Sequence, residues 1–189
     1  MQGVVQDVIA AAKAKPGSIN FASSGNGTSQ HLSGVFFEQL SGTKLSHVPY
    51  KGSSESLSAL MGGQGPDLIF ENLAPALPYI KAGKLRAIGV TSAKRVSTLP
   101  DVPTVAETLS GFDVVSWQAI FAPAGVPKPI VAKLSGALVN TMLDPEMKSK
   151  LVSMGIEPSA MTPAELATFQ KAEVEKWAKV IKTANIKLD

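Results

Sequence analysis

The sequence predicts an α/β domain with a largely parallel sheet, followed by a helix-rich C-terminal part. In the first part, short apolar runs bounded by Gly or Pro alternate with segments whose apolar residues recur at helical spacing. This alternation is typical of parallel sheets covered by helices. Beyond residue 117 helical spacing dominates. The chain has 189 residues, 44% hydrophobic and 17% charged, which is enough apolar material for a buried core.

The expected elements follow one another in a regular order. Apolar residues at helical spacing predict a first helix over 4–14, which Pro16-Gly17 ends. Strands are expected near residues 19–22, 46–49, 67–70 and 86–90, with helices between them. The stretch 92–110 is expected to be irregular. A last strand is expected over 114–121, and it is followed by helices over 129–143 and 163–182.

Composition excludes several classes of protein. The chain has no cysteine, so it forms no disulfide and uses no thiolate chemistry. Its formal charge is +3, but the basic residues are scattered, which argues against a nucleic-acid partner. The nearest approach to a basic cluster comprises Lys84, Arg86, Lys94 and Arg95. No run approaches the ~20 apolar residues of a membrane span, and the N-terminal residues do not have the pattern of a signal peptide.

The most informative segment is the loop 23–29, where a predicted strand leads into a glycine- and hydroxyl-rich turn before a helix. Backbone N–H groups at a helix start, together with the helix dipole, form an anion site. The candidate donors are Ser23, Ser24, Gly25, Gly27, Thr28 and Ser29. The alternative is that Thr28 or Ser29 only caps its own helix. No Gly-Lys-Ser/Thr follows, so the loop is not a P-loop.

Two further predicted strands end in loops of the same kind. One loop contains Lys51 and Gly52, and the other contains Asn72. The carboxyl ends of parallel strands share one edge of a sheet, and ligands bind there. We therefore expect the three loops to surround a small-molecule site, although a lone lysine such as Lys51 is more often simply solvated.

Candidates for catalysis are poor. The two histidines, His31 and His47, are too few for a histidine-rich metal centre, and neither His-Glu-x-x-His nor Gly-x-Ser-x-Gly is present. Asp67 and Glu71 flank one predicted strand without an evident partner for acid–base chemistry. The sequence therefore predicts no catalytic residue, metal ligand or cofactor.

Several segments in a fixed order resemble the tripartite tricarboxylate transporter receptors, also called the Bug family of periplasmic binding proteins. The resemblance covers nearly the whole chain, and the joint order of the motifs is highly specific. The matching motifs are FASSGNGTSQHL at 21–32, HVPYKG at 47–52, FENL at 70–73, GKLRAIGVTS at 83–92, LPDVPTVAE at 99–107, Trp117, and FAPAGVP at 121–127.

The resemblance implies a periplasmic-binding-protein type II-like fold, in which two α/β lobes close on a ligand. Residues 1–116 would form the middle, ligand-binding lobe. Residues 117–189 would be the C-terminal part of the other lobe, whose N-terminal part we expect to be missing, as in a truncated chain with half the cleft. The absent part would leave apolar faces uncovered, so we expect a homo-oligomer or domain-swapped oligomer. The residues expected on these faces are Leu134, Leu138, Phe169 and Trp177.

The resemblance also implies a function. The protein would be a periplasmic receptor, not an enzyme, that captures a small carboxylate and delivers it to membrane transporter subunits. The loop 23–29 would bind the ligand carboxylate, and Lys51, Gly52 and Asn72 would line the cleft. Glu71 stands where many relatives have Asp. Two alternatives remain at this point: the effector-binding lobe of a cytosolic regulator, and a hydrolase-like enzyme that uses the serine-rich rim.

Overall fold

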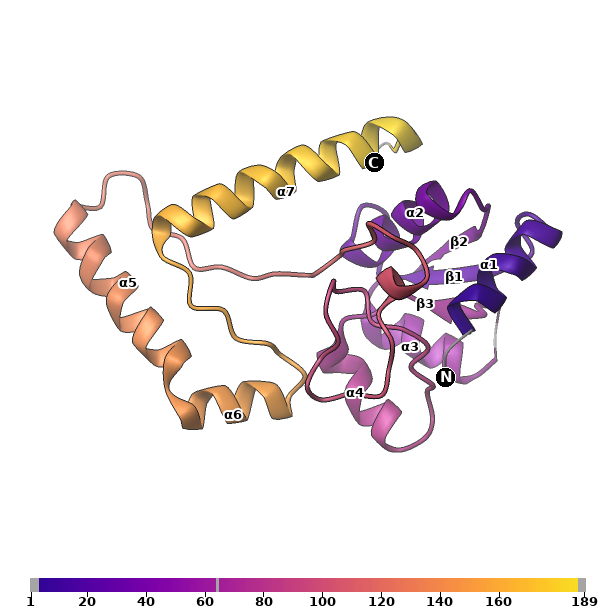
Figure 1. Ribbon diagram of the computed structural model, residues 1–189, viewed down its shortest axis with the longest axis horizontal. Coiled ribbons are helices and arrows are strands. Elements are labelled where there is room, and N and C mark those ends of the chain that lie inside the picture. The colour runs from indigo at the N-terminus through magenta and orange to yellow at the C-terminus, as the bar shows by residue number, and fades with distance from the viewer. Residues whose placement is uncertain (1–3, 64, 187–189) are drawn as a thin grey trace. The chain divides into compact units, whose positions relative to one another are not determined.

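The structure, a computed structural model, describes residues 4–63 and 65–186 (Figure 1). The chain divides into two compact units. The first comprises Met1–Ser116 together with Val180–Asp189, and the second comprises Trp117–Lys179. No helix in the described ranges is both long and apolar enough to cross a membrane.

The first unit is built on a three-stranded parallel sheet of order β2-β1-β3. The strands are β1 (Asn20–Ser23), β2 (Ser46–Pro49) and β3 (Leu68–Ile69). In the central strand β1, Phe21 pairs with His47 of β2 on one side and with Leu68 of β3 on the other. The predicted α/β class with a parallel sheet is therefore confirmed, as are its first three strands.

Helices connect and cover these strands. They are α1 (Val4–Ala14), α2 (Ser29–Ser41), α3 (Ser53–Met61), α4 (Leu73–Lys81) and the short 3-10 helix η1 (Val105–Glu107). Helix α2 begins at the N-cap Thr28, whose side chain accepts from the N–H of His31, and ends at Gly42 with φ 62°. A residue without Cβ adopts this left-handed conformation at little cost, so Gly42 sets where α2 stops.

Aromatic side chains form the centre of the first unit. The rings of Phe21 and Phe70 meet edge to face at 6.1 Å, and those of Phe37 and Phe112 do so at 6.2 Å. Phe21 and Phe112 are almost completely buried. Such ring pairs contribute about 0.5–1.5 kcal/mol beyond the area they bury, so this cluster holds β1, α2 and the segment around residue 112 together.

Two predicted strands are wrong. Residues 86–90 form no strand: Val90 makes only an isolated parallel bridge with Thr104. The N–H of Val90 donates to the carbonyl of Pro103 at 2.9 Å, but Pro103 has no N–H to extend a ladder. Residues 114–121 are not a strand either, since Val114 bonds to Thr91 and no described strand lies beside the rest.

The second unit is helical, as predicted. Its helices are α5 (Lys128–Leu143), α6 (Pro145–Ser153) and α7 (Pro163–Ala184), the last of which continues into the residues assigned to the first unit. Asp144 ends α5 and caps α6 by accepting from the N–H of Met147 at 2.9 Å. The ring of Trp117 packs edge to face on Phe169 at 5.5 Å.

The contact between α2 and β1 leads to a first prediction. A Cβ added at Gly34 would lie 2.6 Å from Cζ of Phe21, closer than real Cβ contacts. Glycine to alanine in a helix normally stabilises by about 1 kcal/mol, but overpacking a core costs about 1–3 kcal/mol. We expect Gly34→Ala to lower the free energy of unfolding, measured by urea titration followed with circular dichroism.

A matched control is available in α5. A Cβ at Gly136 would meet nothing within 4 Å. Gly136→Ala should therefore leave stability unchanged or raise it slightly. Equal and favourable effects of the two substitutions would contradict the packing of α2 on Phe21.

Candidate functional site

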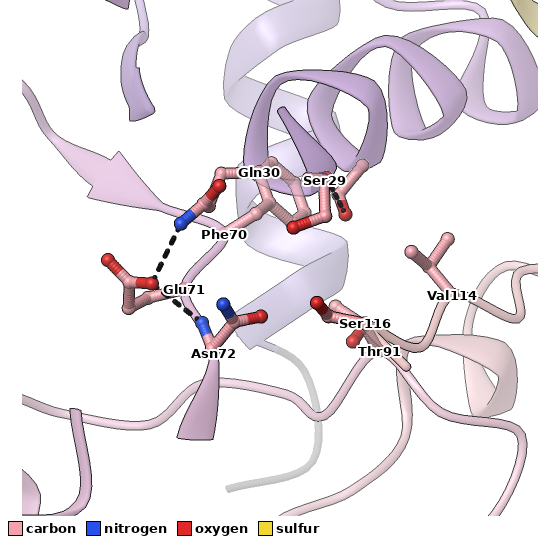
Figure 2. Close-up of a pocket in the computed structure, with 9 residues that line it drawn as sticks. Ser29, Gln30, Phe70, Glu71, Asn72, Thr91, Val114 and Ser116 are labelled. Atoms are coloured by element: carbon pink, nitrogen blue, oxygen red, sulfur yellow. Dashed lines mark hydrogen bonds between the residues drawn. The ribbon is translucent and has the colours of Figure 1, made fainter. Parts of the chain in front are cut away.

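A shallow hollow, called the edge hollow here, lies at the carboxyl ends of β1 and β3. Its lining comes from the start of α2, the residues that follow β3, and two non-helical segments near residues 91 and 115 (Figure 2). The lining residues are Ser29, Gln30, Ser33, Phe70, Glu71, Asn72, Thr91, Val114 and Ser116. Ligands bind at this edge in parallel α/β sheets.

The first turn of α2 leaves two backbone donors free beside the edge hollow. The N–H of Thr28 reaches the carbonyl of Gly25, and that of His31 reaches Oγ1 of Thr28, both at 3.4 Å. Within the described residues, the N–H groups of Ser29 and Gln30 donate to no acceptor. Helix N-termini with free donors favour an anion. The start of α2 can therefore hold a carboxylate through Ser29 and Gln30.

The loop before α2 holds its own shape with most of its polar groups, and ligand contact through them stays a prediction. The N–H of Gly25 donates to Oγ of Ser23 at 3.1 Å, and the N–H of Gly27 donates to Nδ1 of His31 at 3.0 Å. Oγ1 of Thr28 donates to the carbonyl of Gly25 at 2.7 Å. These groups bond within the loop and to α2, and so they hold its shape. Of the predicted residues 23–29, only Ser29 lines the edge hollow.

Four polar side chains link the loops at the ends of the three strands. The Gln30 amide nitrogen donates to Oγ of Ser24 at 2.8 Å and to Oε1 of Glu71 at 2.9 Å. The hydroxyl of Ser53, at the start of α3, donates to the same Oε1 at 3.1 Å and lies 3.1 Å from the hydroxyl of Ser24. The N–H of Asn72 also donates to this oxygen, at 2.8 Å. Figure 2 shows the bonds of Glu71 to Gln30 and Asn72.

The other predicted cleft residues separate into two groups. Asn72 lines the edge hollow as expected. Lys51 and Gly52 do not line it: Lys51 is exposed and its N–H donates to Glu55, whereas Gly52 is the N-cap of α3. Their backbone groups organise the start of α3, so contact with a ligand stays a prediction for both.

The two histidines form a stacked pair beside the loop, in which His31 is buried and His47 is half-buried. The rings of His31 and His47 stack at 4.0 Å with 6° between their planes. Nε2 of His47 lies 2.6 Å from Oγ of Ser23. This distance suits a nucleophile and its base, but Ser23 is completely buried and its oxygen already interacts with Gly25. The pair therefore supports the loop, and the hydrolase-like alternative gains no support from it.

Burial lowers the pKa of His31. Burial, and next the charge of the neighbouring His31, lower the pKa of His47 from 6.5 to about 4. Near neutral pH both rings are therefore uncharged. In this state Nδ1 of His31 can accept the N–H of Gly27.

Sequence reasoning missed most of the lining. Gln30 and Ser33 follow the loop within α2, and a helical projection of 29–33 could have placed them on the side of Ser29. Thr91, Val114 and Ser116 carry no local signal, because they reach the edge hollow from segments without regular structure. Among the described residues, no group of three or more His, Cys, Asp or Glu could hold a metal ion.

A parallel-sheet lobe with free neutral donors at its carboxyl edge is an architecture that binds small ligands. The chain belongs to the tripartite tricarboxylate transporter family receptors, TctC, whose family model matches residues 2–186. The family resemblance found in the sequence is thereby confirmed. This family consists of receptors, not enzymes.

Two curated relatives match most of this chain. One is a UPF0065 protein of Pseudomonas sp. strain P51, 37% identical over 179 residues, which cover 94% of this chain and 53% of the relative. The other is a UPF0065 protein of Agrobacterium vitis, 38% identical over 182 residues, which cover 94% and 52%. The chain thus spans about half the length of these two relatives.

Solved structures of the same kind superpose on the chain. R. palustris Rpa4515 with adipate has a TM-score of 0.85 and 34% identity, and the match covers 96% of this chain and 61% of that one. The periplasmic binding protein BugD has a TM-score of 0.76 and 31% identity, and the match covers 96% of this chain and 62% of BugD. MatC of Rhodopseudomonas palustris with bound malate has a TM-score of 0.76 and 28% identity, and the match covers 93% of this chain and 61% of MatC.

The histidine pair predicts how stability depends on pH. The pKa of His47 is about 4 in the folded chain against 6.5 ordinarily, so the unfolded chain binds more protons between these values. The stabilisation is complete above pH 6.5 and is lost as the pH falls through about 4. We expect the free energy of unfolding to fall in this window, and His47→Gln to flatten the fall.

Glu107 provides the control. Its hydrogen bond to Arg95 lowers its pKa from 4.5 to about 2, so its contribution is lost in a lower pH window. Glu107→Gln should leave the slope above pH 4.5 unchanged. If the free energy of unfolding of His47→Gln depended on pH as steeply as that of the unmodified protein, the lowered pKa of His47 would be contradicted. Histidine ring titration by NMR in the unmodified protein gives an independent measure of both pKa values.

Proposed function

We propose that the protein is a solute-binding receptor that captures a small carboxylate in the edge hollow. The observation that carries this proposal is the pair of free N–H donors of Ser29 and Gln30 at the start of α2. Hydroxyl groups of Ser29, Thr91 and Ser116 and the amide of Asn72 add neutral donors around them. A charge-assisted hydrogen bond is stronger than a neutral one, so these donors suit a carboxylate.

The solved relatives support the carboxylate as ligand class. Rpa4515 was solved with adipate and MatC with malate, both small dicarboxylates. The family description supports delivery of the ligand to a membrane transporter. We infer that the protein acts in the periplasm, as BugD does according to its description, and that its partners are transporter subunits.

The two alternatives are weaker. An effector-binding lobe of a cytosolic regulator would share the fold, but the family model matches almost the whole chain and describes a transport receptor. A hydrolase would need an accessible nucleophile, and Ser23 beside His47 is completely buried.

We further propose that the two units belong to different lobes of a complete receptor. Residues up to 116 hold the edge hollow and would form one ligand-binding lobe. The helical unit 117–179 would contribute to the other lobe. The lengths of the Pseudomonas sp. strain P51 and Agrobacterium vitis relatives, of which the matches cover 53% and 52%, support this reading.

Removal of one backbone donor tests the carboxylate site. Ser29 is the first residue of α2, a position where proline is tolerated, and Thr28 before it is extended (φ −70°, ψ 162°) as proline requires. Ser29→Pro deletes the N–H and the hydroxyl, whereas Ser29→Ala deletes only the hydroxyl. We expect Ser29→Pro to weaken adipate or malate binding by about tenfold or more.

Calorimetry of both variants separates the contributions of the N–H and the hydroxyl. Ser29→Ala should lose less affinity than Ser29→Pro, and circular dichroism should show an intact fold for each. Equal affinity in the unmodified protein and Ser29→Pro would place the carboxylate elsewhere. Absence of binding of both adipate and malate to the unmodified protein would refute this choice of ligands.

Self-association is the second testable part of the proposal. Ile130, Leu134 and Leu138 recur every four residues on α5 and are 50%, 54% and 38% exposed. Exposed apolar stripes of this kind favour association. We propose that a second copy of the chain covers this stripe. Sedimentation should show a dimer that Leu134→Glu dissociates, while Lys133→Glu, on the same helix, leaves it intact. A monomer at all concentrations would contradict this.

A further inference from the structure

We infer that Glu71 makes the edge hollow selective for ligands that bring one carboxylate to it, and that it rejects those with a second carboxylate nearby. The inference rests on the proposed function, in which the edge hollow takes the carboxylate. It adds a specificity-determining residue and narrows the ligand class. Tricarboxylates would then be poor ligands of this protein.

The charges around the edge hollow are the first argument. Of its nine lining residues, Glu71 is charged and the other eight are neutral. Ser29 starts α2 and Asn72 is the N-cap of α4, and each helix start contributes the equivalent of about +0.5 elementary charge. The combined negative charge of one ligand carboxylate and Glu71 already exceeds this positive charge. The hydroxyl and amide donors can bond to a second carboxylate but cannot neutralise it.

The fixed position of Glu71 is the second argument. Its Oε1 accepts from Gln30 at 2.9 Å, from Ser53 at 3.1 Å and from the N–H of Asn72 at 2.8 Å. Gln30 is only 5% exposed, so rotation of Glu71 away would leave its buried amide nitrogen with the hydroxyls of Ser24 and Ser53 alone and would remove its charged acceptor. The carboxylate cannot turn aside to admit a second negative charge without breaking this network.

The absence of a counter-charge is the third argument. The ion pairs found in the described part of the chain join Glu38, Glu107 and Glu173 to basic residues, and none includes Glu71. Oε2 of Glu71 is buried and accepts no hydrogen bond from the described residues. A charge held away from water is poorly screened by solvent and salt. It therefore repels an added carboxylate more strongly than an exposed glutamate would.

The same charge tolerates other substituents. A ligand hydroxyl or ammonium group beside the carboxylate is a hydrogen-bond donor, and a carboxylate accepts from donors. A methylene group adds no charge. Glu71 therefore limits how many ligand carboxylates lie near the edge hollow. A second carboxylate far from it, such as the one at the other end of adipate, is still accepted.

A matched pair of ligands tests the inference. Adipate and β-carboxyadipate differ by one carboxylate on the same carbon chain. In the unmodified protein, calorimetry should give a Kd for β-carboxyadipate at least about tenfold above that for adipate. Glu71→Gln removes the charge but keeps a side-chain oxygen for the three donors, so the ratio of the two Kd values should fall toward one.

Glu71→Asp is the control that separates charge from position. Aspartate keeps the charge but shortens the side chain, so both ligands should bind more weakly while their ratio stays high. A ratio that is equally high in Glu71→Gln overturns the inference, and so does a ratio near one in the unmodified protein. In both cases adipate binding would leave the proposed function standing, whereas failure of adipate and malate to bind would remove that support for it.

Discussion

The close approach of α2 to the central strand β1 is the constraint on which the first unit depends. Gly34 lies directly over the ring of Phe21, and any larger residue would push the helix away from the sheet. Phe21 is buried between its two neighbouring strands and stacks on His47 at 4.8 Å. Because α2 starts where the loop after β1 ends, this contact also fixes the position of the edge hollow.

The edge hollow combines rigid support with neutral donors. The loop before α2 uses its own glycine N–H groups and serine and threonine hydroxyls to hold its shape, so the free donors are those of the first two residues of α2, Ser29 and Gln30. Binding groups fixed in advance lose less conformational entropy when a ligand arrives. Two uncharged histidines complete this support, so the potential donors of this loop are largely engaged within the protein.

The second unit has a different balance of forces. Among its described residues, Glu173 is buried, while apolar side chains such as Ile120, Phe121 and Leu134 are largely exposed. Its helices are stabilised locally, by the Asp144 cap and by the bond from Trp177 to Glu173 at 3.0 Å. Local bonds of this kind define helices but do not bury the area that stabilises a domain.

The sequence by itself determined the α/β class, three of the strands, the α-helices except α6, and the family, because these follow from local periodicity, caps and ordered motifs. It also placed Ser29 and Asn72, in the segments that follow β1 and β3, at the edge where the hollow lies. Tertiary structure alone decided that 86–90 bridges to Thr104, since the proline at 103 limits pairing only once the two segments meet. It also decided that Gly25 and Gly27 bond inward and that Thr91 and Ser116 reach the edge hollow. These outcomes depend on which distant groups come within hydrogen-bond distance, and no local pattern encodes that.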